Sequence, residues 1–210
     1  YWGKPEKAAA IQRDGWYISG DAVRKTERSE LVYLDRLEHL VQLASGHLYP
    51  PQFIETRLRF SPFIKDVMVL GDATRPWVGA LINIDMAVTS RWAEERRIAF
   101  STFTDLSQRP EVRQLVQGEI RRINKLLPEG SRVVRFANFP KELDPDEGEL
   151  TRTRKLRREF LEVRYRALID GLYAGAADIA CEIAVTYQDG RQGVLRATVV
   201  ATDIDQTPTP

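Results

Sequence analysis

The sequence lacks most of the residues that build familiar metal and nucleophile sites. It contains one cysteine, Cys181, and two histidines, His39 and His47, among 210 residues. An internal disulfide is therefore impossible, and a zinc site with histidine and cysteine ligands is excluded. The sequence also has no Gly-x-Ser-x-Gly element and no glycine-rich loop with phosphate-binding spacing. We do not expect a self-contained ATP-using enzyme, although the chain could be part of one.

Excess charge and long apolar runs are also missing. The 31 Lys and Arg residues nearly balance the 30 Asp and Glu residues, for a formal net charge of +1, which argues against a basic surface dedicated to nucleic acid. No apolar run approaches the roughly 18 residues of a membrane span, and the single thiol fits a reducing, cytoplasmic setting. The chain begins Tyr1-Trp2-Gly3 without a methionine or signal sequence, so we expect a segment of a longer protein.

What the sequence does contain is a mixture of strand and helix signals, which predicts an α+β fold. Short β-prone runs predict strands at 16–18, 31–34, 40–43, 67–70, 78–84 and 133–136. Helical spacing of apolar residues predicts helices that begin at Pro50-Pro51 and that span 87–97, 110–127 and 155–173. Residues 178–204 alternate between apolar and polar around the turn signal Asp189-Gly190, which predicts a C-terminal β-hairpin.

Four short motifs occur in a defined order along the first 155 residues. They are Tyr1-Trp2-Gly3-Lys4-Pro5-Glu6, then Asp14-Gly15-Trp16-Tyr17-Ile18-Ser19-Gly20-Asp21, then Asp35-Arg36 leading to Ser45-Gly46, Pro51 and Ile54-Glu55, and finally Gly148-Glu149-Leu150-Thr151 leading to Lys155. In this order they resemble the adenylate-forming acyl-CoA synthetase superfamily, in particular its bacterial long-chain fatty acid–CoA ligases. The resemblance extends to about residue 175. Each motif alone is weakly specific, whereas their order over this length is strongly specific.

The resemblance implies a domain organisation and a function. Residues 1–35 would end a large N-terminal adenylation domain, 36–175 would form a small C-terminal lid domain with a short hairpin and a three-stranded sheet flanked by helices, and 176–210 would add a β-hairpin with a frayed tail. In the family the lid swings about a hinge between adenylation of a carboxylic acid and attack by CoA. The implied activity is that of an acid–thiol ligase using a fatty acid, ATP, Mg²⁺ and CoA. Without the missing N-terminal domain, the segment is expected to be inactive.

Lys155 is the residue to which the resemblance assigns catalysis. It matches the lysine that enters the active site during adenylation and contacts the carboxylate and the α-phosphate. A compact ammonium on a long flexible stem suits this movement, whereas the planar fork of arginine is bulkier and is held by several hydrogen bonds. The alternative is an ordinary surface lysine at the start of a helix. Four neighbouring arginines could shape the electrostatic field of the site, contact the phosphates of CoA, or be solvated surface residues. They are Arg152, Arg154, Arg157 and Arg158.

The resemblance assigns further roles by position. Asp21 and Arg36 match residues that contact the ribose of the adenylate, and Glu38 matches the hinge, where the family usually has Asp or Lys. Ser45 and Gly46 match a loop that approaches the pantetheine of CoA, although relatives more often carry a second glycine or an asparagine there. The ordinary alternatives are turn residues and exposed charges. A different reading of the whole segment is a degenerate, non-catalytic lid or an anion-binding interaction module.

Overall fold

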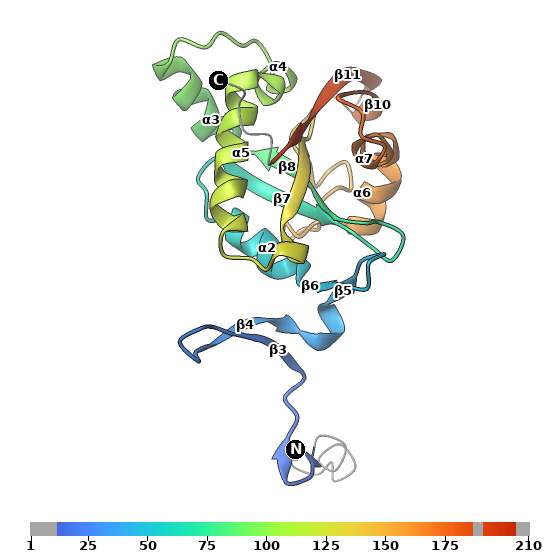
Figure 1. Ribbon diagram of the computed structural model, residues 1–210. Helices are drawn as coiled ribbons and strands as arrows, with labels where there is room; N and C mark the ends of the chain where they lie inside the picture. Colours follow the sequence, from blue (N-terminus) through green and yellow to red (C-terminus); the bar gives the residue numbers. More distant parts are fainter. Residues whose placement is uncertain (1–11, 187–190, 205–210) are drawn as a thin grey trace.

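The computed structural model describes residues 12–186 and 191–204, and it shows an α+β domain preceded by an arm of paired strands (Figure 1). The paired strands are β1 (Gln12–Arg13) with β2 (Trp16–Tyr17), β3 (Asp21–Lys25) with β4 (Leu31–Arg36), and β5 (Val41–Gln42) with β6 (Leu48–Tyr49), all antiparallel. A 3-10 turn, η1 (Leu37–His39), joins β4 to β5. The arm, residues 12–36, therefore connects to β5, β6 and the domain through one short turn.

A five-stranded sheet forms the centre of the domain, in the order β10-β11-β9-β8-β7. Its strands are β7 (Ile64–Leu70), β8 (Val78–Ile84), β9 (Val133–Asn138), β10 (Asp178–Thr186) and β11 (Gln192–Asp203). β8 and β9 are parallel, and the other neighbours are antiparallel. The predicted α+β fold, the three central strands and the C-terminal hairpin are confirmed. The hairpin continues the central sheet, because residues 201–203 of β11 pair with residues 135–137 of β9.

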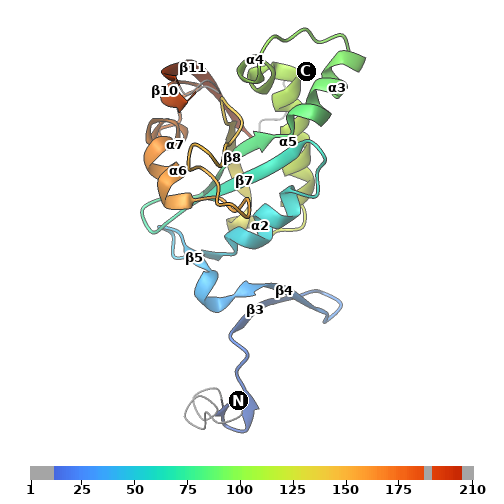
Figure 2. The ribbon, with the colours of Figure 1, turned by 180° about the vertical axis from the view of Figure 1, so that it is seen from behind.

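Helices cover both faces of this sheet (Figures 1 and 2). One side carries α2 (Pro51–Leu58), α3 (Met86–Glu95), α4 (Phe103–Gln108) and α5 (Pro110–Asn124), and the other carries α6 (Arg158–Arg164) and α7 (Arg166–Tyr173). In β7, Val67 and Val69 belong to the apolar cluster that includes residues of α2 and α5, whereas Met68 and Leu70 belong to the cluster that includes residues of α6 and α7. This alternation follows from the two-residue period of a strand. Within the described part of the chain, no helix is long and apolar enough to cross a bilayer.

The ends of the helices follow local chemistry. Pro51 and Pro110 occupy the first turns of α2 and α5, where a missing N–H group costs no hydrogen bond. The Asp85 side chain accepts a hydrogen bond from the Val88 amide at 2.9 Å and thereby caps α3. Such signals explain why helices starting near 50, 87 and 110 were predictable.

The predicted helix 155–173 is wrong in two respects. First, α6 begins only at Arg158, because an isolated antiparallel bridge between Leu150 and Leu156 holds the preceding residues in a loop. Second, the helix is interrupted at Tyr165, whose φ of −105° and ψ of 23° are not helical. Lys155 therefore lies on a loop and not on a helix.

Other differences are smaller. The strand predicted at 40–43 is limited to β5, and β3 and α4 were not predicted. β3 reads Asp-Ala-Val-Arg-Lys, and its charged residues hide any strand period. α4 has only 6 residues, too few to show a helical period. The motif 1–6 and the turn signal Asp189-Gly190 lie outside the described residues.

Two glycines give a test of this packing. A Cβ atom on Gly171 of α7 would lie 2.7 Å from Cγ2 of Ile179 in β10, whereas one on Gly118 of α5 would meet nothing within 4 Å. We expect Gly171→Ala to lower the free energy of unfolding by about 1–3 kcal/mol through overpacking. Gly118→Ala should raise it by about 0.5–1 kcal/mol, because alanine favours a helix interior. Urea denaturation of both variants checks this, and similar effects from both would contradict the close contact of α7 with the hairpin.

Candidate functional site

Lys155 lies in a tight loop closed by backbone contacts. The bridge between Leu150 and Leu156 closes its base. Inside the loop, the Thr151 amide donates to the Lys155 carbonyl at 2.8 Å, and the Lys155 amide donates to Thr151 Oγ1 at 3.0 Å. Arg154 turns the chain with a φ of +58°, in the left-handed region. The backbone is thus held, while the Lys155 side chain is exposed and its ammonium has no hydrogen bond or ion pair with any described residue.

Glu149 anchors the start of this loop from inside the protein. Its side chain is 0% exposed. One carboxylate oxygen accepts hydrogen bonds from Lys141 Nζ at 2.6 Å and from the Asp144 amide at 2.9 Å. The other accepts one from the Tyr165 hydroxyl at 2.6 Å. Burial raises the pKa of Tyr165, and the adjacent Glu149 carboxylate raises it further. Both oxygens of this buried charge therefore have partners, as a stable arrangement requires.

A hollow of about 310 Å³ lies beside Lys155, between the loop and α2. Its basic side chains are Arg59, Arg154, Lys155 and Arg158. Its wall also holds two carboxylates, Glu55, which pairs with Arg158, and Asp66, which keeps its charge while it accepts a hydrogen bond from the neutral Asn83 Nδ2 at 3.0 Å. Four cations against two carboxylates leave the hollow with an excess of positive charge, which favours an anionic group.

Asp21 and Arg36 face each other across the hairpin of β3 and β4. They are register partners, and Asp21 Oδ1 lies 2.9 Å from Arg36 NH1. The same Arg36 nitrogen donates to the Ser19 carbonyl at 2.6 Å. Gly20 between them has a φ of +74°, which glycine adopts at low cost. The structure thus brings together the two residues to which the resemblance assigns a contact with the ribose.

Glu38 lies in η1, directly after this pair. Its side chain is 81% exposed, and its carboxylate is 3.9 Å from His39 Nε2. Asp35, two positions before the turn, makes two contacts. Its Oδ1 accepts a hydrogen bond from the Arg36 amide at 2.8 Å and lies 3.0 Å from His39 Nδ1. The exposed Glu38 side chain would not oppose a change of the backbone angles, whereas the contact of Asp35 with His39 spans η1 and would have to break.

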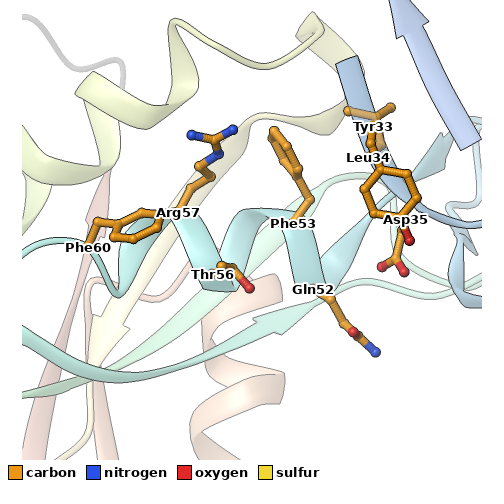
Figure 3. Close-up of a pocket in the computed structure, with 8 residues that line it drawn as sticks. All are labelled: Tyr33, Leu34, Asp35, Gln52, Phe53, Thr56, Arg57 and Phe60. Atoms are coloured by element: carbon orange, nitrogen blue, oxygen red, sulfur yellow. The ribbon is translucent and has the colours of Figure 1, made fainter. Parts of the chain in front are cut away.

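A second hollow, of about 400 Å³, spans this joint (Figure 3). Tyr33, Leu34 and Asp35 of β4 form one wall, and Gln52, Phe53, Thr56, Arg57 and Phe60 in and after α2 form the other. β4 precedes η1 and α2 follows it, so any rotation at η1 changes the distance between the two walls. The Arg57 guanidinium lies 4.9 Å from the centre of the Phe53 ring and partly covers it.

Ser45 and Gly46 form the turn between β5 and β6. Gly46 has a φ of +81°, and its amide donates to the Leu43 carbonyl at 2.9 Å. The adjacent Ala44 amide donates to the Arg75 carbonyl at 3.0 Å, which places this turn beside residues 72–75. The two residues do not line the hollow beside Lys155. His47, next in sequence, is a packing residue, because its Nε2 lies 3.0 Å from Ser131 Oγ.

Apart from Glu38, which lies in η1, the predicted site residues thus occupy three separate places. Asp21 and Arg36 lie together on the arm, Ser45 and Gly46 lie at the turn of β5 and β6, and Lys155 lies at its own hollow. Sequence reasoning missed the roles of Glu149 and of the pair Glu55–Arg158, although both carboxylates belong to motifs that it singled out. The sequence does show a glutamate in an uncharged stretch, Gly148-Glu149-Leu150. This pattern does not reveal that the glutamate side chain is buried. Among the described residues, no group of three or more His, Cys, Asp or Glu side chains could hold a metal ion.

The α+β domain is similar in fold to the C-terminal domains of adenylate-forming enzymes. The family described as AMP-binding enzyme C-terminal domain matches residues 38–177, and the chain belongs to this family.

Its relatives include proteins named as long-chain-fatty-acid–CoA ligases. The chain is 27% identical over 174 residues to long-chain-fatty-acid–CoA ligase FadD15 of Mycobacterium tuberculosis, covering 82% of this chain and 29% of the relative. It is 29% identical over 177 residues to human long-chain-fatty-acid–CoA ligase 1, covering 83% of this chain and 25% of the relative. The chain therefore spans less than a third of the length of these relatives.

The solved structures agree on the fold. The adenylation domain of a carboxylate reductase from Mycobacterium chelonae superposes with a TM-score of 0.53 at 25% sequence identity. The match covers 83% of this chain and 26% of that structure. The resemblance to adenylate-forming enzymes expected from the motif order is thereby confirmed.

Proposed function

We propose that this chain supplies the hinge and lid of a fatty acid–CoA ligase, which activates a fatty acid with ATP and transfers the acyl group to CoA. The relatives named above are acyl-CoA ligases, and the chain matches only a part of each. On this proposal residues 1–35 end the large adenylation domain, 36–175 form the lid, and 176–210 are an addition. The acyl pocket and the phosphate loop then belong to the large domain.

The observation that carries the proposal is the environment of Lys155. A held loop backbone presents an ammonium that no described residue neutralises, beside a hollow with excess positive charge. During adenylation negative charge is shared between the attacking carboxylate and the α-phosphate. An ammonium delivered to that position at the end of a four-carbon stem stabilises the transition state more than the separate substrates. Lys155 is the proposed catalytic residue.

Asp21 and Arg36 are the proposed nucleotide contacts. The contact with Arg36 NH1 engages one oxygen of the Asp21 carboxylate, and the side chain is still 31% exposed. A carboxylate has acceptor sites on both oxygens, so it can accept hydrogen bonds from two ribose hydroxyls while paired. Glu38 is the proposed pivot, and Ser45 and Gly46 are proposed to lie along the path of the CoA thiol. We assign no step to Mg²⁺ in this chain, because the described residues offer no cluster to bind it.

Exposed apolar side chains on the arm support the presence of a covering domain. They include Trp16, Tyr17, Leu31, Tyr33 and Leu37, and Phe60 is exposed just after α2. Exposed apolar side chains mark an interaction site where they gather on one face. Tyr33 and Phe60 both line the hollow in Figure 3, which lies next to η1. On this proposal a large domain lies against the lid there.

The test uses the full-length protein. We expect ATP–pyrophosphate exchange that depends on a fatty acid, and acyl-CoA formation once CoA is added. Asp21→Asn should raise KM for ATP about 10- to 100-fold, the cost of a lost hydrogen bond to a charged group. Asp170→Asn is the matched control, because Asp170 is exposed on α7, and it should leave KM unchanged. Absence of exchange with short, medium and long fatty acids, or equal KM values for the two variants, would contradict the proposal.

A further inference from the structure

The C-terminal hairpin lies beyond the family match and yet shares an apolar cluster with the lysine loop. The match ends at residue 177, and β10 begins at Asp178. On β10, Ile179, Cys181 and Ile183 are buried in the cluster that also contains Leu150, at the base of the loop. The hairpin is therefore an addition to the family fold that shares an apolar cluster with the base of the proposed catalytic loop.

Arg164 is the polar link between the two. Its side chain is only 14% exposed. The guanidinium NH2 pairs with Glu147 Oε2 at 2.5 Å and also donates to the carbonyl of Ala184 on β10. NH1 donates to the Glu147 carbonyl at 3.3 Å. Nε lies 3.3 Å from Glu149 Oε1, close enough for an ion pair, although it is not aligned to donate a hydrogen bond.

Arg164 reaches across a gap between these elements. A hollow of about 490 Å³ separates Asp146 and Glu147 from Ala184, Val185 and residues 192–194, with Arg164 in its wall. Lys141 Nζ supplies the second cation, 2.9 Å from Glu147 and 2.6 Å from Glu149. Two nearly buried carboxylates are thus balanced by two cations, and loss of either cation leaves repulsion directly before the loop.

We propose that the β10–β11 hairpin holds the Lys155 loop in its working position through Arg164, which makes Arg164 a positioning residue for adenylation. The Ala184 carbonyl orients the guanidinium, and the guanidinium orients Glu147 and Glu149. The Glu149 carbonyl accepts the Arg157 amide at 3.0 Å, across the base of the loop. The role of Lys155 in this inference rests on the proposed function, whereas the coupling of hairpin to loop does not.

The coupling is tested by amide hydrogen exchange in the full-length protein. Arg164→Lys keeps the charge but replaces the planar fork by a point charge that cannot span Glu147 and Ala184 together. Ile183→Ala loosens the hairpin from its buried side, and Thr198→Ala is the control, because Thr198 is an exposed side chain of the same hairpin that does not line the hollow. We expect the amides of Thr151, Lys155 and Arg157 to exchange about tenfold faster in the first two variants and unchanged in the control.

Cys181 reports hairpin opening independently. The residue is only 4% exposed, and burial raises the pKa of its thiol to about 11, so its reaction with a thiol reagent at pH 8 requires the hairpin to open. Ile183→Ala should speed this labelling and the exchange of the loop amides together. Faster labelling with unchanged loop exchange would overturn the coupling, even if Arg164→Lys does not fold.

Half-reactions separate positioning from general destabilisation. Arg164→Lys should lower kcat for adenylation about 10- to 100-fold, as a small displacement of a catalytic group does. KM for ATP and acyl transfer from preformed acyl adenylate to CoA should be unchanged, whereas loss of folded protein would lower both half-reactions equally. Normal adenylation by Lys155→Ala would refute the proposed function. An inactive Lys155→Ala together with normal adenylation by Arg164→Lys would refute this inference alone.

Discussion

Lys155→Ala in the full-length protein is expected to lower fatty-acid-dependent ATP–pyrophosphate exchange by about 10²-fold or more, the usual cost of removing a charge contact made in the transition state. The structure gives the reason for a selective effect. The Lys155 side chain is exposed and contributes no described contact to stability, while the loop conformation is held by the backbone and by Thr151. The variant should therefore unfold at the same urea concentration as the wild type.

Two companion variants sharpen this result. Lys155→Arg retains the charge but carries a larger planar group, so we expect it to restore little of the rate. Lys125→Ala removes an exposed lysine at the end of α5 and should leave exchange unchanged. Wild-type exchange by Lys155→Ala would show that this ammonium does not act in adenylation.

The second large effect concerns stability. Glu149→Gln is expected to lower the free energy of unfolding by about 3–5 kcal/mol, as removal of one partner from a buried ion pair does. The substitution preserves the shape of the side chain. It leaves Lys141 Nζ, which lies 2.6 Å from the Glu149 carboxylate in the wild type, without its full counter-charge. Its amide NH₂ group also replaces an oxygen that accepts from Tyr165 or from the Asp144 amide.

An exposed ion pair of the hairpin provides the control. Glu182 and Arg196 lie 2.8 Å apart across β10 and β11, and their side chains are 66% and 77% exposed. Glu182→Gln should cost under about 1 kcal/mol, because solvent screens such pairs. Urea denaturation of both variants makes the comparison. A similar small loss for both would mean that the Glu149 network does not hold the loop.

Local pattern was sufficient for the regular elements. β7, β8 and α5 were predictable because β-branched runs and a helical apolar stripe extend over whole elements. The break at Tyr165 was not predictable from the apolar spacing, which continues through residues 156–168 as if one helix were present. At the break, the buried Tyr165 side chain donates a hydrogen bond to Glu149, 16 positions earlier in the chain, and this long-range contact is not visible in the apolar spacing.

The sequence by itself determined the family and the residues worth testing, because the order of short motifs survives without knowledge of any contact. It also determined most strands and helices through their periods. Only the tertiary structure decided that Lys155 lies on a loop, that Glu149 is buried, and that Arg164 joins that loop to the added hairpin. These facts depend on long-range pairs, such as Arg158 with Glu55 at a separation of 103 residues. Burial and charge pairing of this kind arise when the sheet and its covering helices assemble, and no local pattern of residues records them.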